Sequence, residues 1–160
     1  MMTELEKRDL YIVVSRIESN HDPTAFRFEP EFADRIPNND PALKRASEYY
    51  HAYTPSLKAF LSFSVGRIQV LVYNLFFYPE VFEVVKSLRK FPSVPYILSE
   101  AEEFEIFKAL LKAFRIDFNP LESYQNAVAF ATRYNGNPAY ANRLYRGYID
   151  EFGDKPFEIA

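Results

Sequence analysis

Four apolar residues near the start of the chain recur at the helical spacing i, i+3, i+4 and i+7: Leu10, Val13, Val14 and Ile17. Thr3 and Glu6, just before them, have the spacing of a capping box, in which each residue accepts a backbone N–H of the first helical turn. We therefore expect a first helix that ends near Glu18. The run at 12–14 is β-branched and would also suit a strand, so a strand near 8–17 is the alternative.

The longest apolar stretch covers residues 55–77, and polar positions divide it at intervals of four, four, three and four. These positions are Lys58, Ser62, Gly66, Gln69 and Tyr73. A helix that is buried except for one narrow polar stripe has this pattern, so we predict that 55–77 is the central helix of the fold. The alternative is a β-hairpin that turns at Gly66 and Arg67, because apolar residues alternate with serines over 61–65.

Prolines mark most of the other expected helix starts. Six prolines follow a residue that suits the position before a helix: Asp22-Pro23, Asp40-Pro41, Thr54-Pro55, Tyr78-Pro79, Asn119-Pro120 and Asn137-Pro138. Ser99 and Glu102 form a second capping box. These signals predict helices over 41–53, from Pro79, from Ser99, over 120–134 and over 138–152, with Gly153 as a C-cap.

Residues 19–40 are rich in Pro, Asn and Asp, which indicates a long connection between helices. We expect Phe26, Phe28 and Phe32 to anchor this connection on the core, with one short helical turn after Pro30. A chain of 160 residues fits one domain.

These patterns predict an all-α fold, a single-domain bundle of about six to seven helices. The helical domain covers 1–153, and 154–160 form a short C-terminal tail. The alternative is an α+β fold in which strands lie near 8–17 and 59–76. Glycine is scarce, with four residues, and this argues against hairpins with glycine turns.

Composition narrows the class of protein. The net charge of −3 does not fit a bulk nucleic-acid binder, whose surface is normally basic. The chain has no cysteine, which excludes disulfides, thiolate zinc sites and a cysteine nucleophile. The N-terminal residues are too charged for a signal peptide, and Lys58 and Arg67 interrupt the apolar stretch at 57–78. We therefore expect a soluble, cytoplasmic protein without a membrane span.

Both histidines follow a glutamate at a distance of three residues, as Glu18 and His21 and as Glu48 and His51. Glu-x-x-His from two helices belongs to the ligand set of di-iron carboxylate bundles, because side chains at i and i+3 project from one helix face. However, Glu48 shares its face with Lys44 as a solvent-side pair, and His21 falls at a helix end. We expect no metal site and no cofactor, and these four residues are the only candidates for one.

Motifs for nucleophilic catalysis or phosphate binding are missing. No serine lies in a Gly-x-Ser-x-Gly turn, and the chain has no glycine-rich phosphate loop. The glutamates over 100–105 would suit paired acid and base carboxylates, but the positive N-terminal turn of a helix explains them better.

Arginine and tyrosine concentrate near the C-terminus, and both residue types are enriched in protein interfaces. The candidate interaction residues are Tyr140, Arg143, Arg146, Arg133 and Tyr134. On the last helix we expect Tyr140, Arg143 and Arg146 to face outward, with Gly147 between the arginines and the core face.

The sequence thus predicts a non-enzymatic interaction module, either an adaptor or regulator or a small subunit of a larger assembly, that binds a protein partner or itself. One alternative is a small-molecule or metal-binding helical protein, with a di-metal enzyme as one case. The other is an accessory protein associated with nucleic acid.

Overall fold

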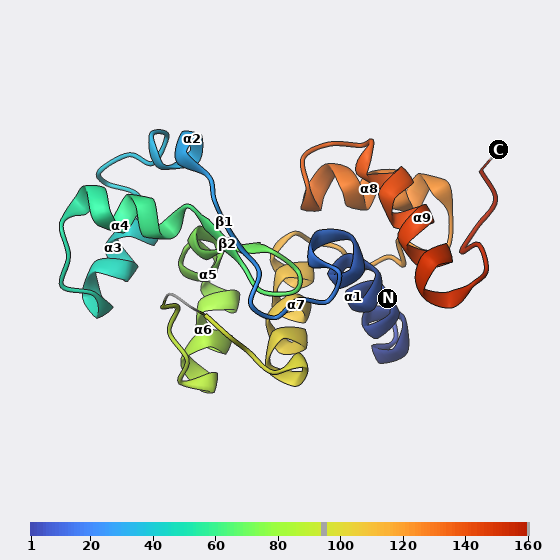
Figure 1. Cartoon of the computed structure of the whole chain (residues 1–160), viewed down its shortest axis with the longest axis horizontal. Coiled ribbons are helices and arrows are strands. Elements are labelled where there is room, and N and C mark those ends of the chain that lie inside the picture. Colours follow the sequence, from blue (N-terminus) through green and yellow to red (C-terminus); the bar gives the residue numbers. More distant parts are fainter. Residues whose placement is uncertain (94–95, 160) are drawn as a thin grey trace.

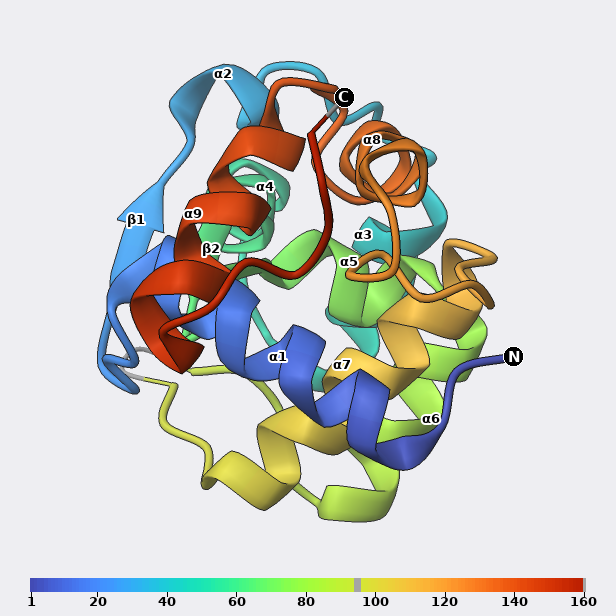
Figure 2. The ribbon, with the colours of Figure 1, turned by 90° about the vertical axis from the view of Figure 1, so that its right-hand side faces the viewer.

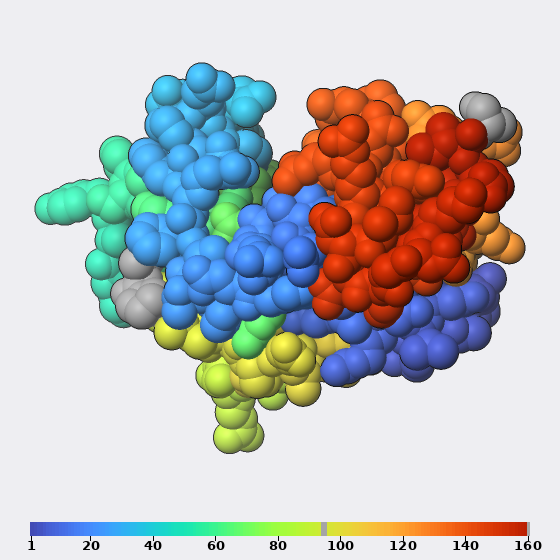
Figure 3. Space-filling model, turned by 45° about the vertical axis from the view of Figure 1, so that its right-hand side comes forward, coloured from blue at the N-terminus to red at the C-terminus, as the bar shows by residue number. Residues whose placement is uncertain are grey.

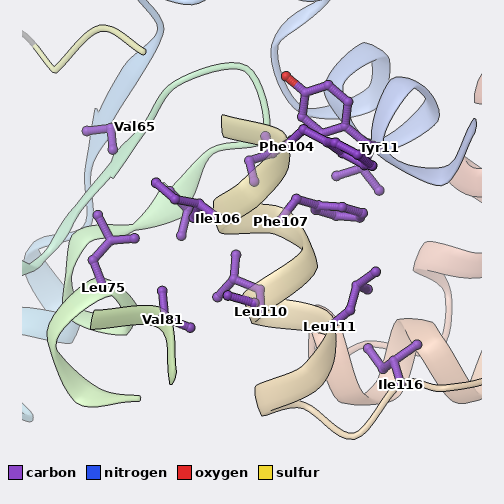
Figure 4. Packing of buried hydrophobic residues seen from close by; sticks show 14 of the residues in the cluster. Tyr11, Val65, Leu75, Val81, Phe104, Ile106, Phe107, Leu110, Leu111 and Ile116 are labelled. Atoms are coloured by element: carbon purple, nitrogen blue, oxygen red, sulfur yellow. The ribbon is translucent and has the colours of Figure 1, made fainter. Parts of the chain in front are cut away.

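Helix α7 (Glu100–Ala113) lies at the centre of the protein in the computed structural model, which describes residues 1–93 and 96–159 (Figure 1). Seven of its residues are buried: Glu103, Phe104, Ile106, Phe107, Ala109, Leu110 and Leu111. On one side, the rings of Phe104 and Phe107 lie 5.6 and 5.7 Å from the ring of Tyr11. On the other, Ile106 points toward Val65 and Leu75 (Figure 4). The core therefore forms around α7.

Helix α1 (Glu4–Ser19) begins with the predicted capping box, since Thr3 and Glu6 accept each other's backbone N–H groups. It ends at Asn20, whose left-handed backbone lets its N–H bond back to Arg16. The first predicted helix is thus confirmed, and the alternative strand near 8–17 is wrong. Its β-branched residues fit a helix because Val13 and Val14 are fully buried, and tertiary burial outweighs their strand propensity.

The predicted central helix over 55–77 is wrong, and the hairpin alternative is correct in its middle. The stretch divides into α4 (Thr54–Leu61), β2 (Phe63–Val65), β3 (Val70–Leu71) and α5 (Val72–Phe77). Gly66 and Gln69 have positive φ angles of 79° and 50°, which end helical geometry and turn the chain between β2 and β3. The stretch 55–77 is apolar because residues on both sides of this turn are buried.

A segment far away in the sequence completes this small sheet. Strand β1 (Phe26–Phe28) pairs antiparallel with β2, which pairs antiparallel with β3. The register places Phe26 opposite Val65 and Phe28 opposite Phe63. Phe26 and Phe28 are exposed, so the expectation that they anchor the connection on the core is wrong. Phe32 does pack inward, edge-on against Tyr73, from the predicted short helix α2 (Pro30–Ala33).

The proline signals divide into two groups. Helices α3 (Pro41–Tyr49), α4 and α6 (Pro79–Leu88) begin at or beside their prolines, although α3 ends before the predicted residue 53. Helices α8 (Tyr124–Tyr134) and α9 (Tyr140–Phe152) begin later than predicted, and no helix begins at Pro23. At Asp22, Asn119 and Asn137 the side-chain oxygen instead accepts the N–H two residues on, which makes a turn.

The fold is a mostly helical single domain, as predicted, with nine helices, several of them short, in the part of the chain that the structure describes. α1 packs against α9, which packs against α8, and these three helices form one side of the molecule (Figure 2). Gly153 caps α9 with a left-handed backbone, as predicted. The segment after it carries a buried residue, Phe157, which contacts the rings of Tyr124 and Tyr145. Among the described helices none is long and apolar enough to cross a membrane.

Candidate functional site

A cleft of about 320 Å³ opens between the β1–α2 segment and the C-terminal end of α8. Figure 3 shows the hollow between the light-blue residues that include α2 and the orange and red C-terminal helices. The end of α1 and the β2–β3 hairpin contribute Glu18, Ser64 and Gln69 to its surface. Most of the side chains around the cleft are polar or charged.

Glu18 is the carboxylate on the α1 side of this cleft. It is half-buried near the end of α1, and the hydroxyl of Tyr140 donates to its Oε1 at 2.8 Å. Burial raises the pKa of Tyr140 well above its ordinary value, so this phenol stays protonated and remains a donor at neutral pH. A donor held in the core therefore fixes the Glu18 carboxylate in one orientation.

The β1–α2 wall of the cleft carries charges of both signs. Arg27 donates from Nε to Glu29 Oε1 at 2.7 Å, and the Arg35 guanidinium lies 5.8 Å from the centre of the Phe32 ring. Glu31 is exposed on the same wall. The cleft therefore has carboxylates on both sides, at Glu18 on one and at Glu29 and Glu31 on the other.

Amides and aromatic rings complete the cleft. Gln69, Asn74 and Asn135 line it, together with the rings of Phe114 and Tyr134. The Tyr134 ring stacks on Phe130 with centroids 4.9 Å apart, which fixes its plane. Amides that form hydrogen bonds and flat apolar rings together suit a ligand that has both hydroxyl groups and C–H faces.

The five predicted interaction residues separate into core and surface. Tyr140 is 2% exposed, so the expectation that it faces outward is wrong. Gly147 explains the error, because it too is buried and faces α1, where a Cβ would lie 2.8 Å from Ile17 Cγ1. The close approach of α1 to Gly147 turns Tyr140 toward Glu18.

The arginines of this group are exposed, and two of them bond the backbone of other segments. Arg133 donates to the carbonyl of Arg115 at 2.7 Å, and Arg143 donates to the carbonyl of Ile17 at 3.0 Å. Arg146 has no partner among the described residues. Tyr134 lies in the cleft instead of beside Arg146 on the surface.

Because Arg143 has a hydrogen-bond partner and Arg146 has none among the described residues, their replacement should affect stability differently. Arg143→Ala removes a charged donor from the last turn of α1, so we expect the free energy of unfolding to fall by about 0.5–1 kcal/mol. Arg146→Ala has no bond to lose and is expected to change it by less than about 0.5 kcal/mol. Urea denaturation of both variants measures the difference, and equal effects would contradict it.

The four candidate metal ligands do not meet. Glu18 accepts from Tyr140, while His21 bonds Ser15 Oγ at 2.8 Å through Nδ1 and Glu151 at 3.0 Å through Nε2. Glu48 and His51 are exposed on and after α3, on the other side of the molecule (Figure 1). The described residues contain no group of three or more His, Asp or Glu that could hold a metal ion.

One cluster, formed by Ser15, His21 and Glu151, has the residue types of a hydrolytic triad, but its serine is not accessible to a substrate. Ser15 is 1% exposed inside α1, so its hydroxyl cannot reach a substrate. The cluster instead closes the end of α1, because the N–H of His21 also bonds the carbonyl of Ser15. We therefore assign it a structural role that links α1 to α9.

Sequence reasoning missed the role of Glu103, which it grouped with the other glutamates of the α7 N-terminus. The structure buries Glu103 to 1% exposure, and the Tyr11 hydroxyl donates to it. Burial is the main cause that raises the pKa of this carboxyl above its ordinary value. The sequence did carry one signal of this burial. Glu103 directly precedes Phe104 and lies four residues before Phe107, so it borders the apolar face of the helix.

The raised pKa of Glu103 predicts a change of stability with pH. The unfolded chain loses this proton near the ordinary value of 4.5, whereas the folded protein keeps it to higher pH. The stability that protonation contributes is therefore complete below 4.5 and is lost as the pH rises through the raised value. Glu103→Gln has no carboxyl to lose this proton. The free energy of unfolding of the wild type, compared with that of the variant, should therefore fall from pH 4.5 upward in urea titrations. A wild-type value that rises with pH relative to the variant would contradict the prediction.

Comparison with protein families, with curated proteins and with solved structures gives no match for this chain. The cleft is therefore interpreted from its own geometry.

Proposed function

We propose that the cleft binds a hydroxyl-rich chain, an oligosaccharide or polysaccharide, and that Glu18 is the general acid for hydrolysis of a glycosidic bond. The observation that carries the proposal is the half-buried Glu18 carboxylate, which borders a polar cleft and is held in place by the buried Tyr140 hydroxyl. Glycoside hydrolysis is a reaction that a pair of carboxylates performs without another catalytic group.

The other groups around the cleft support this chemistry over other hydrolytic chemistry. Ser64 lines the cleft, but neither histidine does, so the described lining holds no Ser–His pair for nucleophilic catalysis. Aromatic rings and amides also line the cleft, and they suit the C–H faces and hydroxyl groups of a sugar ring. Arg27 and Arg35 would donate hydrogen bonds to acidic substituents if the bound chain carries them.

The proposed reaction needs two carboxylates. In its protonated form Glu18 donates the proton of the oxygen that does not accept from Tyr140 to the glycosidic oxygen, as the bond from that oxygen to the anomeric carbon breaks. A water molecule supplies the new hydroxyl on the anomeric carbon, and its proton passes to a carboxylate on the β1–α2 wall. We assign this role to Glu31, because Glu29 already accepts a bond from Arg27.

The test is hydrolysis of a panel of polysaccharides of different linkage and charge: starch, cellulose, xylan, chitin and bacterial peptidoglycan. We expect new reducing ends from at least one of them, and amide resonances of 18–19, 68–70 and 134–135 that shift when its fragments are added. No hydrolysis of any member, or shifts confined to the arginine surface of α9, would contradict the proposal.

The sequence-based hypothesis of a protein-interaction module remains a proposal, and three of its residues, Arg133, Arg143 and Arg146, are exposed. It predicts a partner or a dimer whose affinity falls in Arg146→Ala. A cytoplasmic location remains a prediction of the same hypothesis.

A further inference from the structure

The buried Glu103 carboxylate lies beneath the turn that joins β2 to β3. Its Oε1 accepts from the Tyr11 hydroxyl at 2.8 Å, and its Oε2 accepts from the backbone N–H of Arg67 at 2.9 Å. The backbone amide of Ile68 also lies beside it. Tyr11 belongs to α1 and Glu103 to α7, so this one carboxylate joins both helices to the turn.

The turn is also bonded to three other segments of the chain. Ser19, the residue after Glu18, donates from Oγ to the Arg67 carbonyl at 2.7 Å. The Arg67 guanidinium donates to the Leu98 carbonyl at 2.9 Å, ahead of α7. Gln69 donates from Nε2 to the Ala25 carbonyl at 3.0 Å, ahead of β1. The turn is therefore bonded to the segment that carries Glu18 and to the strand that forms the opposite wall.

The same turn forms part of the cleft surface, since Ile68, Gln69 and Val70 all line the cleft. Gln69 has a φ of 50°, a conformation that a side chain with a Cβ adopts at a cost of about 1–3 kcal/mol. Such a conformation persists only where the surroundings hold it. Gln69 bonds the carbonyls of Gly66 and Ala25 directly. Glu103 adds to this constraint from below, because it accepts from the N–H of Arg67 in the same turn.

We propose that Glu103 is a positioning residue for the cleft: through its bonds to the 66–69 turn it holds Gln69 at the distance from Glu18 that the ligand requires. This inference rests on the proposed function for its catalytic consequence. Its structural part, the position of Gln69, can be measured independently.

The experiment compares Glu103→Met with Tyr11→Phe in the full chain. Methionine keeps the length of the side chain but has no oxygen to accept from Tyr11 or Arg67, whereas glutamine could still accept from Arg67 through its amide oxygen. Tyr11→Phe removes only the bond to Oε1 and is the matched control. Far-UV circular dichroism establishes that each variant folds, and Glu103→Asp, shorter by one methylene, is the replacement should the methionine variant fail to fold.

Three measurements decide the inference. In Glu103→Met we expect hydrogen exchange at the Arg67 amide to rise about tenfold, the cost of one lost hydrogen bond. The side-chain amide resonances of Gln69 should shift. On a polysaccharide that the wild type hydrolyses, KM should rise about tenfold while kcat changes less than about threefold, because the ligand is held less well and Glu18 is intact.

In Tyr11→Phe all three quantities should stay close to the wild type. Unchanged exchange at Arg67 and unchanged Gln69 resonances in Glu103→Met would overturn the inference, and so would a fall in kcat at constant KM. A wild type that hydrolyses no polysaccharide overturns the proposed function alone, and the Gln69 resonances then decide whether Glu103 positions the cleft.

Discussion

Replacement of Glu18 by glutamine is expected to lower kcat for polysaccharide hydrolysis by about 10²–10⁴-fold, the usual contribution of a general acid. Glutamine has the same shape and still accepts from the Tyr140 hydroxyl, but it has no proton to give to the leaving oxygen. KM should therefore stay within about threefold of the wild-type value, and the free energy of unfolding within about 1 kcal/mol. Initial rates of reducing-end release over a range of substrate concentrations give both constants.

The matched control for this variant is Glu48→Gln. Glu48 is the other glutamate that precedes a histidine by three residues, and it is exposed on α3, away from the cleft. Its replacement should leave kcat unchanged. A Glu18→Gln variant that keeps more than about a tenth of the wild-type kcat would show that Glu18 is not the acid.

The second large effect is expected at Gly66. Alanine there is strained by the φ of 79°, and its Cβ would lie 2.3 Å from the buried Glu103 Oε2. We expect Gly66→Ala to lower the free energy of unfolding by about 2–4 kcal/mol, the sum of backbone strain and displacement of a buried carboxylate. Thermal and urea denaturation both measure this loss.

Two other glycines provide the control for Gly66→Ala. Gly136 and Gly153 have φ angles of 79° and 78°, but a Cβ on either would meet nothing within 4 Å. Alanine at these positions therefore bears the backbone strain alone, about 1 kcal/mol. If the three variants lose the same stability, the contact between Gly66 and Glu103 contributes nothing.

Local signals in the sequence are reliable where the structure they predict is also local. The capping boxes at Thr3 and Ser99 form as predicted, because each depends on residues three positions apart. The Asp-Pro and Asn-Pro signals are less reliable, since Asp or Asn oxygens also accept an N–H in an isolated turn. Asp40 starts a helix and Asn119 does not, although both accept an N–H two residues on. The tertiary packing of the residues after the turn decides between the two outcomes.

The prediction of a long central helix failed because the sheet that replaces it depends on a distant partner. Strand β2 pairs with β1, so that Phe63 lies opposite Phe28, and all of α3 and α4 lies between these two residues in the chain. No local pattern reveals such a pairing. Gly66 and the alternation of apolar residues with serines over 61–65 were the local indications of the hairpin, and the helical period across 55–77 outweighed them.

The candidate site was only partly within reach of the sequence. In the sequence Glu18 is one half of a metal-ligand pattern, but its actual partner is Tyr140, which lies 122 residues later in the chain. The clustering of Arg and Tyr in the sequence places Tyr134 and Tyr140 together with surface arginines. In the structure the two tyrosines and the arginines have different environments. Burial raises the pKa of both phenols, whereas Arg146 is exposed to solvent.

The bond between Glu18 and Tyr140 has a consequence for the protein as it is made. A ribosome that adds about 5–20 residues per second needs roughly 6–24 seconds to pass from one of these residues to the other. Throughout that interval α1 is present without α9, one of the two described helices that pack against it, and the Glu18 carboxylate lacks its donor. The nascent chain thus carries an exposed apolar face of α1 and an unfinished cleft, and both are completed only when the last helix leaves the ribosome.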